Sequence, residues 1–102
     1  MRPIPLEIVC YHCQQSVEKI IKAFLIYSRV KPEKTHDLES LNDRCKIIDK
    51  SFKKIDEKCI RLNAYSSQPR YPFEIEIEES HALLALNDSK EINEFIKEKI
   101  II

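Results

Sequence analysis

The sequence contains no glycine in its 102 residues. Glycine is the usual residue of phosphate-cradling loops and two-residue hairpin turns, because it adopts positive φ angles without a steric penalty. Its absence excludes the Gly-rich phosphate-binding motifs and disfavours tight β-hairpins. A chain built from helices is therefore favoured.

The chain also lacks tryptophan, and it has no apolar run approaching the roughly 18 to 20 residues that cross a bilayer. The sequence does not begin with basic residues followed by an apolar stretch, the pattern of a secretory signal. The four cysteines are therefore expected to be reduced thiols rather than disulfides. We expect a soluble, cytoplasmic protein with no membrane partner.

The composition, 43% hydrophobic and 33% charged, suffices for one core, and the length suits a single domain spanning residues 1–102. The net charge of zero argues against a strongly basic DNA-binding protein. The charges are nevertheless unevenly spread, because residues 44–73 hold eight basic and three acidic residues, whereas residues 74–102 hold three and eight. We expect these segments to pack together; a basic surface that faces a polyanion is the alternative.

Apolar residues recur at three- and four-residue steps after Pro5, which predicts a long amphipathic helix ending near Tyr27 or Ser28. Its polar face is expected to carry Gln14, Gln15, Glu18, Lys19 and Lys22. Glu18 and Lys22 are four residues apart, with the acid first, and this order favours an ion pair across one helical turn.

The spacing predicts further helices after a connector at residues 29–36. Thr35 or Asp37 is expected to cap a helix over Leu38–Asp49. The apolar period continues to Leu62 after a break at residues 49–51, as either a second helix or one bent helix. A final helix is predicted from a cap at Ser80 to about Ile100. Its expected core residues are Leu83, Leu86, Ile92, Phe95, Ile96 and Ile100.

Three features carry candidate chemistry. Cys10, His12 and Cys13 have a spacing compatible with zinc, but no second pair follows, so buried thiols are the better interpretation and no metal or cofactor is expected. The histidines His12, His36 and His81 fall in different elements, and nothing selects a catalytic triad. From its position at a helix start, His36 is more readily a structural residue than a phosphate ligand.

The segment between Pro69 and Pro72 is the third feature. Arg70 offers a forked donor for phosphate and Tyr71 an aromatic face for stacking on a base. The equally supported alternative is a docking loop in which Tyr71 packs against the bundle and Arg70 pairs with a following glutamate.

Three short motifs together resemble a HEPN domain, a family associated with nucleotide binding. They are YHCQQSVEKIIKAFL at residues 11–25, KTHDL at residues 34–38 and RYP at residues 70–72. The resemblance covers roughly residues 8–100. It implies an antiparallel, up-and-down bundle of about four helices that forms homodimers and often works with a minimal nucleotidyltransferase in a toxin–antitoxin-like pair.

The sequence departs from this family in two places. Ribonuclease members carry an Arg-x4-6-His motif late in the bundle, but here ten residues separate Arg70 from His81. Arg29 and His36 match the spacing only formally, in the wrong connector. Relatives of this kind also carry a further helical turn or two before Gln14, so the start of the chain is short or misassigned, which would leave part of the final helix's core face to a dimer or partner.

The leading hypothesis is a non-catalytic homodimer that binds a nucleotide or nucleic-acid phosphate and acts with a nucleotidyltransferase. Its expected binding residues are Lys19, Lys22, His36, Arg70 and Tyr71. Lys19 and Lys22 could instead belong to a solvated helix face. The rival hypotheses are a metal-independent ribonuclease toxin that uses His36 and Arg70, and a protein-interaction module without a ligand.

Overall fold

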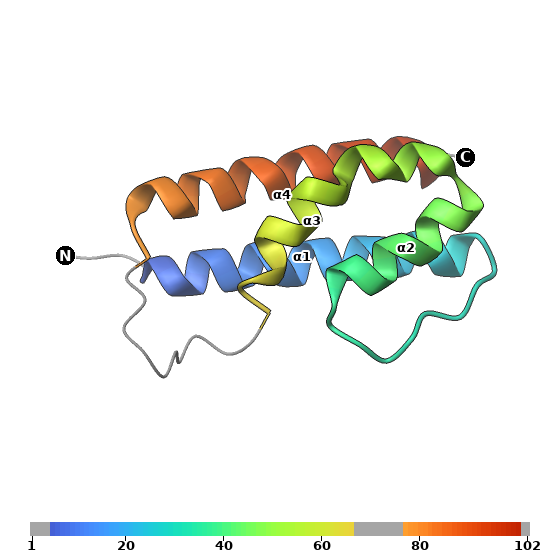
Figure 1. Ribbon diagram of the computed structural model, residues 1–102, viewed down its shortest axis with the longest axis horizontal. Coiled ribbons are helices and arrows are strands. Elements are labelled where there is room, and N and C mark those ends of the chain that lie inside the picture. Colours follow the sequence, from blue (N-terminus) through green and yellow to red (C-terminus); the bar gives the residue numbers. More distant parts are fainter. Residues whose placement is uncertain (1–4, 67–76, 101–102) are drawn as a thin grey trace.

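The computed structural model describes residues 5–66 and 77–100. The described chain forms α1 (Leu6–Tyr27), α2 (Leu38–Ile48), the 3-10 helix η1 (Lys50–Ile55), α3 (Asp56–Asn63) and α4 (Glu79–Ile100), as Figure 1 shows. No strand occurs within these two ranges. The predicted all-α bundle of about four helices is confirmed.

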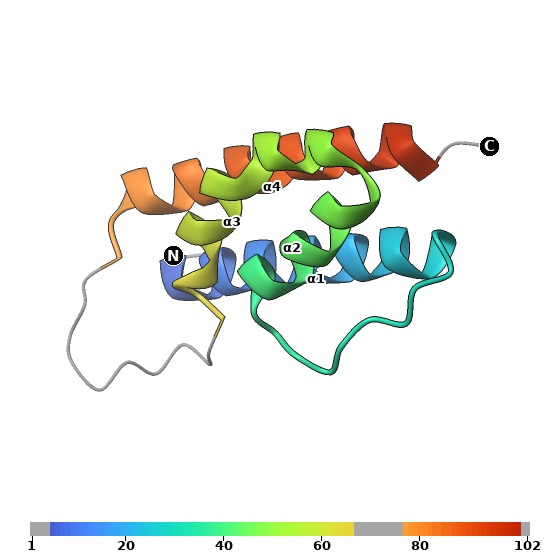
Figure 2. The same cartoon turned by 45° about the vertical axis from the view of Figure 1, so that its right-hand side comes forward.

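The two long helices, α1 and α4, lie side by side and run in the same direction (Figures 1 and 2). Ser16 near the middle of α1 accepts a hydrogen bond from Asn93 in the later half of α4. The connector at residues 28–37 carries the chain back along α1, so that α2 starts against the middle of this helix. η1 and α3 then run back against the direction of α2, and α4 reverses the direction again.

The C-terminus of α1 shows how the chain ends a helix without glycine. Arg29 has a φ of 66°, in the left-handed region that glycine usually occupies. The backbone N–H of Arg29 donates to the carbonyl of Ile26 at 2.9 Å, and that of Val30 donates to Leu25 at 2.8 Å. This pair of bonds is the Schellman motif, and Val30 packs against the core beside it.

The predicted break after α2 falls at Asp49, and the two-helix alternative is the observed one. Asp49 ends α2 in an extended conformation, and its carboxylate accepts the N–H of Ser51 to start η1. At the other end of α2, Asp37 is the N-cap and accepts the N–H of Glu39 at 3.0 Å. Thr35 supports this cap by accepting the N–H of Asp37.

The prediction for the final helix was wrong at three residues. Ser80 lies inside α4, which begins at Glu79, and Leu83 and Leu86 are 64% and 49% exposed. The helix has two candidate apolar faces, and the one made mainly of small or apolar residues lies against the core. Its buried residues are Ala82, Ala85, Ser89, Ile92 and Ile96, together with Asp88, whose charge is paired with Arg61. The stripe through Leu83 and Leu86 continues into Lys90 and is therefore left outside.

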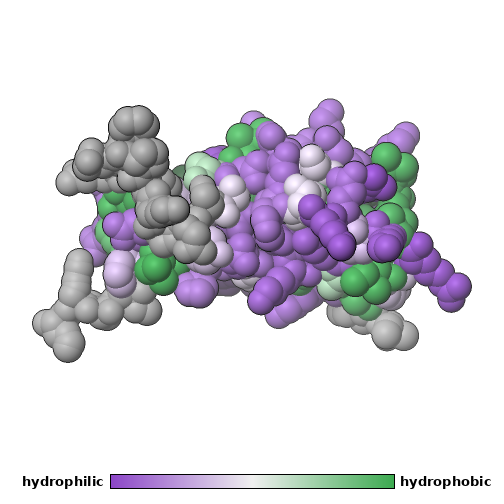
Figure 3. All heavy atoms as spheres, turned by 90° about the horizontal axis from the view of Figure 1, so that it is seen from below, coloured by the Kyte–Doolittle hydropathy of each residue, from purple (hydrophilic) through white to green (hydrophobic). Residues whose placement is uncertain are grey.

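Three aromatic rings tie the helices together in the core. Phe52 of η1 lies 4.5 Å from the ring of Phe24 in α1 and 5.1 Å from that of Phe95 in α4. Figure 3 shows that the face seen from below is hydrophilic along its middle, with apolar patches toward its ends. Within residues 5–66 and 77–100, no helix combines the length and the apolar composition that crossing a membrane requires.

The basic and acidic segments pack together, as the charge pattern predicted. Arg61 of α3 makes two 2.8 Å contacts with Asp88 of α4, and Lys58 lies 3.4 Å from Glu91 on the same pair of helices. Lys99 at the end of α4 contacts Asp49 at 2.9 Å. Charge complementarity between segments therefore contributes to the position of α4.

Candidate phosphate-binding site

The connector reaches α2 through a segment that two other helices hold in place. Gln14 of α1 donates its side-chain N–H to the carbonyl oxygen of His36 at 3.0 Å. Asn63, the last residue of α3, accepts the N–H of Leu38 and donates to the carboxylate of Asp37. The backbone around His36 is therefore fixed from both sides.

The side chain of His36 rests on a buried carboxylate. Its Nδ1 lies 3.0 Å from both carboxylate oxygens of Glu18, and the Lys22 ammonium lies 2.9 Å from one of them. Burial of Glu18 opposes its charge, yet the hydrogen bonds and charges of Lys22 and His36 leave its pKa below the usual value. Because an ionised carboxylate only accepts, Nδ1 of His36 must carry the proton of this contact.

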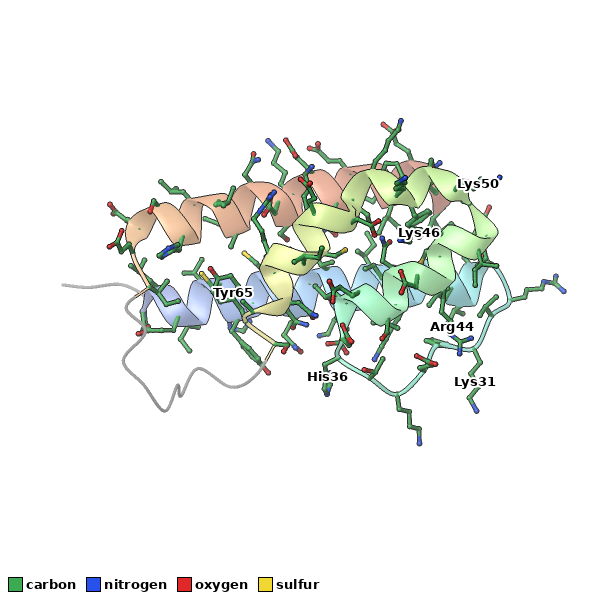
Figure 4. All side chains as sticks on the ribbon, viewed as in Figure 1. Lys31, His36, Arg44, Lys46, Lys50 and Tyr65 are labelled. Carbon is green, nitrogen blue, oxygen red and sulfur yellow. The ribbon has the colours of Figure 1, made fainter. Side chains whose placement is uncertain are left out.

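The opposite edge of the same ring is open to solvent. The His36 side chain is 71% exposed, whereas that of Glu18 is 8% exposed. With Nδ1 directed at Glu18, Nε2 lies on the far side of the rigid imidazole ring and faces outward, as Figure 4 shows for the side chain as a whole. Neutral imidazole offers a lone pair at Nε2, and imidazolium offers a charged donor that suits a phosphate oxygen.

The two lysines predicted for the site are placed differently. Lys22 belongs to it through Glu18, as the predicted one-turn ion pair. Lys19 lines a neighbouring groove of about 460 Å³ between α1 and α4, which Asn93 lines from the opposite helix. Gln15 connects the groove with the Glu18–His36 contact, because it lines the groove and also donates hydrogen bonds to Gln14 and Glu18.

The predicted residues Arg70 and Tyr71 lie outside the described residues, so their relation to His36 stays a prediction. Among the described residues, no hydrogen bond joins Arg29 to His36: Arg29 closes α1, and His36 precedes α2. The formal ribonuclease spacing between them does not form a paired site there.

Sequence reasoning misplaced Glu18 and Gln14 and missed Asn63. The first two were assigned to a polar face, but both are buried. Gln14 falls between Cys10 and Val17 on the four- and three-residue steps of the buried stripe, and that register was the available signal. The role of Asn63 depends on a contact across 25 residues, for which the sequence holds no local signal.

The cysteines follow the interpretation as buried thiols. Cys10, Cys13, Cys45 and Cys59 are all buried and free. Burial raises the pKa of Cys13 to about 11, while His12 between the first two thiols is exposed on another face of α1. In the part of the chain that the structure describes, no three His, Cys, Asp or Glu side chains are grouped so that they could hold a metal ion.

Comparison with protein families finds that the model of the HEPN domain matches residues 5–100. Comparison with curated proteins and with solved structures found no significant match. The family match covers α1 through α4, including the segment that positions His36.

Proposed function

Because this chain belongs to the HEPN domain family, we propose that it binds the phosphate of a nucleotide or nucleic acid at the exposed edge of His36, without catalysing a reaction. The observation that carries the proposal is the asymmetry of the imidazole. Its Nδ1 is held by the buried carboxylate of Glu18, whereas its Nε2 side is open. A ring fixed in this way meets a ligand with little loss of conformational freedom.

The surrounding charges support an anionic ligand. The negative charge of Glu18 is already matched by Lys22 at 2.9 Å, so a charged His36 adds net positive charge to the site. Lys19 has no ion-pair partner among the described residues and lines the adjoining groove. We include Arg70 and Tyr71 from the sequence alone, as a phosphate donor and a stacking face.

The test is direct binding of a fluorescent nucleotide and a short labelled RNA by fluorescence anisotropy, at low and moderate salt. His36→Ala is expected to weaken binding by about tenfold, and each phosphate contact removed should lower the salt slope by about one. Arg70→Ala and Lys19→Ala test the two further cations. Lys97→Ala, an exposed lysine on α4, is the matched control, and circular dichroism verifies folding.

No binding by the wild-type protein at low salt would refute this function. Equal losses in His36→Ala and Lys97→Ala would reduce it to nonspecific charge attraction. In either case the protein-interaction module would become the better interpretation.

The ribonuclease alternative has one specific observation in its favour, because a histidine oriented by a carboxylate is also an arrangement for general acid–base catalysis. It predicts that expression of the chain alone arrests growth and that His36→Ala abolishes the arrest. It also predicts metal-independent cleavage of RNA by the purified protein. Binding without cleavage, at the same protein concentration, would favour the non-catalytic function.

The proposal also includes a homodimer and a nucleotidyltransferase partner, as family membership suggests. Co-expression with a minimal nucleotidyltransferase, followed by affinity purification through either protein, tests the second. Recovery of neither protein with the other would remove the partner from the proposal.

A further inference from the structure

The outer face of α4 carries exposed leucines that the bundle does not use. Leu83 and Leu86 are 64% and 49% exposed and lie on the side of α4 away from its buried residues. Figures 1 and 2 show α1 and α3 on one side of this helix, with the N-terminal half of α4 at the edge of the molecule. Exposed leucines adjoining on one helix face are typical of an interface.

The two leucines belong to a stripe with a charge at each end. Glu79, Leu83, Leu86 and Lys90 follow one another at steps of four, three and four residues, which places them along one face of the helix. Glu79 and Lys90 are exposed, and neither has an ion-pair partner among the described residues. The stripe therefore runs from an acid through two leucines to a base.

This order is complementary to itself when reversed. A twofold axis beside α4, perpendicular to the helix and level with residues 84 and 85, would place Leu83 opposite Leu86 of a second copy. The same axis would place Glu79 opposite Lys90 twice, once at each end. Isologous interfaces require such self-complementarity, whereas a randomly charged face would oppose like charges.

We propose that two copies of this chain dimerise through this stripe of α4, with the two helices antiparallel, Leu83 packed on the second copy's Leu86 and Glu79 paired with its Lys90. The inference rests on the homodimer of the proposed function and gives it a surface and a geometry. A four-residue stripe is a small contact, so the dissociation constant is expected to be on the order of 10 μM.

Sedimentation equilibrium of the full chain, from about 1 μM to about 500 μM, measures the association. Leu83→Ala and Leu86→Ala are each expected to raise the dissociation constant by at least about tenfold, because each is lost on both sides of the axis. Leu84→Ala is the matched control: this leucine is exposed on the same helix but faces the pocket near Arg61 and Tyr65. It should change the constant by less than about twofold.

The charges give a test that depends on the twofold geometry. Glu79→Lys alone and Lys90→Glu alone should each weaken their own homodimers, since like charges then face each other at both ends. An equimolar mixture of the two variants should recover association as a heterodimer, because opposite charges then meet at both ends. Native mass spectrometry distinguishes the heterodimer from either homodimer by mass.

A wild-type protein that stays monomeric across the range would overturn the proposal and assign the leucines to a different partner. A dissociation constant that Leu83→Ala and Leu86→Ala leave unchanged would also overturn it. So would a mixture of the two charge variants that shows no preference for the heterodimer. RNA binding by Leu83→Ala is measured in parallel. Loss of the dimer with retained binding, or the reverse, separates this surface from the His36 site.

Discussion

At the residue scale, several ionised side chains in the described part of the chain are held by neighbours of opposite charge. Glu18 is a buried example, and its pKa falls below the usual value because Lys22 and His36 outweigh the effect of burial. Asp49 is a more exposed example. Hydrogen bonds from Lys99 and Ser51 lower the pKa of its carboxyl to about 2.

The Asp49 contact predicts a defined pH dependence. A carboxyl whose pKa is lower in the folded state stabilises the fold above its unfolded pKa, which is about 3.9, and loses this contribution as the pH falls toward the folded pKa. The loss should therefore lie between about pH 4 and pH 2. Carbon-detected NMR titration of the carboxyl group measures the pKa directly.

Lys99→Met supplies the comparison, because it keeps the length of the side chain and removes the charge. The pKa of Asp49 should rise in this variant while its contact with Ser51 persists. An unchanged pKa would mean that the Lys99 contact is not maintained in solution.

At the element scale, α1 ends in a turn that is unfavourable for the residue placed there. Arg29 occupies the left-handed region at a φ of 66°, since the sequence offers no glycine for the Schellman motif. A residue with a Cβ costs roughly 1 to 2 kcal/mol in this conformation relative to the right-handed region. The hydrogen bonds from Arg29 and Val30 to the last turn of α1 offset that cost.

Arg29→Gly should consequently stabilise the protein. Glycine removes the steric penalty but gains conformational entropy in the unfolded chain, so the expected net gain is about 0.5 to 1 kcal/mol. Urea unfolding followed by circular dichroism measures the change.

Ser28→Gly is the matched control for this prediction. Ser28 precedes Arg29 and has a φ of −87°, which needs no glycine, so its replacement should destabilise the fold slightly. If both substitutions destabilised the protein equally, the left-handed turn would not be the source of the effect.

At the scale of the whole molecule, the opposite charges of two distant segments meet across α3 and α4. The side chain of Asp88 is only 2% exposed, and that of Arg61 is 42% exposed. The carboxylate of Asp88 accepts hydrogen bonds from Nε and Nη2 of Arg61. A buried charge that loses its partner is costly, whereas replacing both partners with apolar side chains is often nearly neutral.

Removing one partner of this pair should cost more than removing both. Arg61→Met is expected to lower the free energy of unfolding by about 2 kcal/mol, a value reduced from that of fully buried pairs because Arg61 is partly exposed. The double variant Arg61→Met with Asp88→Leu should recover most of this loss. Urea unfolding of the two single variants and the double variant completes the cycle.

An additive cycle, in which the double variant is as unstable as the sum of the single variants, would contradict this account. It would mean that Asp88 is stabilised by something other than Arg61.

Periodicity and capping residues in the sequence determined the helices themselves. The end of α1 at Tyr27, the Asp37 cap and the break at Asp49 are local features, because each depends on residues within one or two turns of the chain. The sequence also indicated that the basic and acidic segments would meet, since unpaired charge of one sign is unfavourable in a small protein.

Tertiary structure alone decided which stripe of α4 faces inward and what surrounds His36. Leu83 and Leu86 are as apolar as core residues, and only the packing of the helices, which buries Ala82 and Ala85 instead, leaves them outside. Gln14, Glu18 and Asn63 reach His36 and its neighbours across 18 to 26 positions of sequence. Local preferences carry no information about contacts at such separations, because these contacts form only when the helices pack.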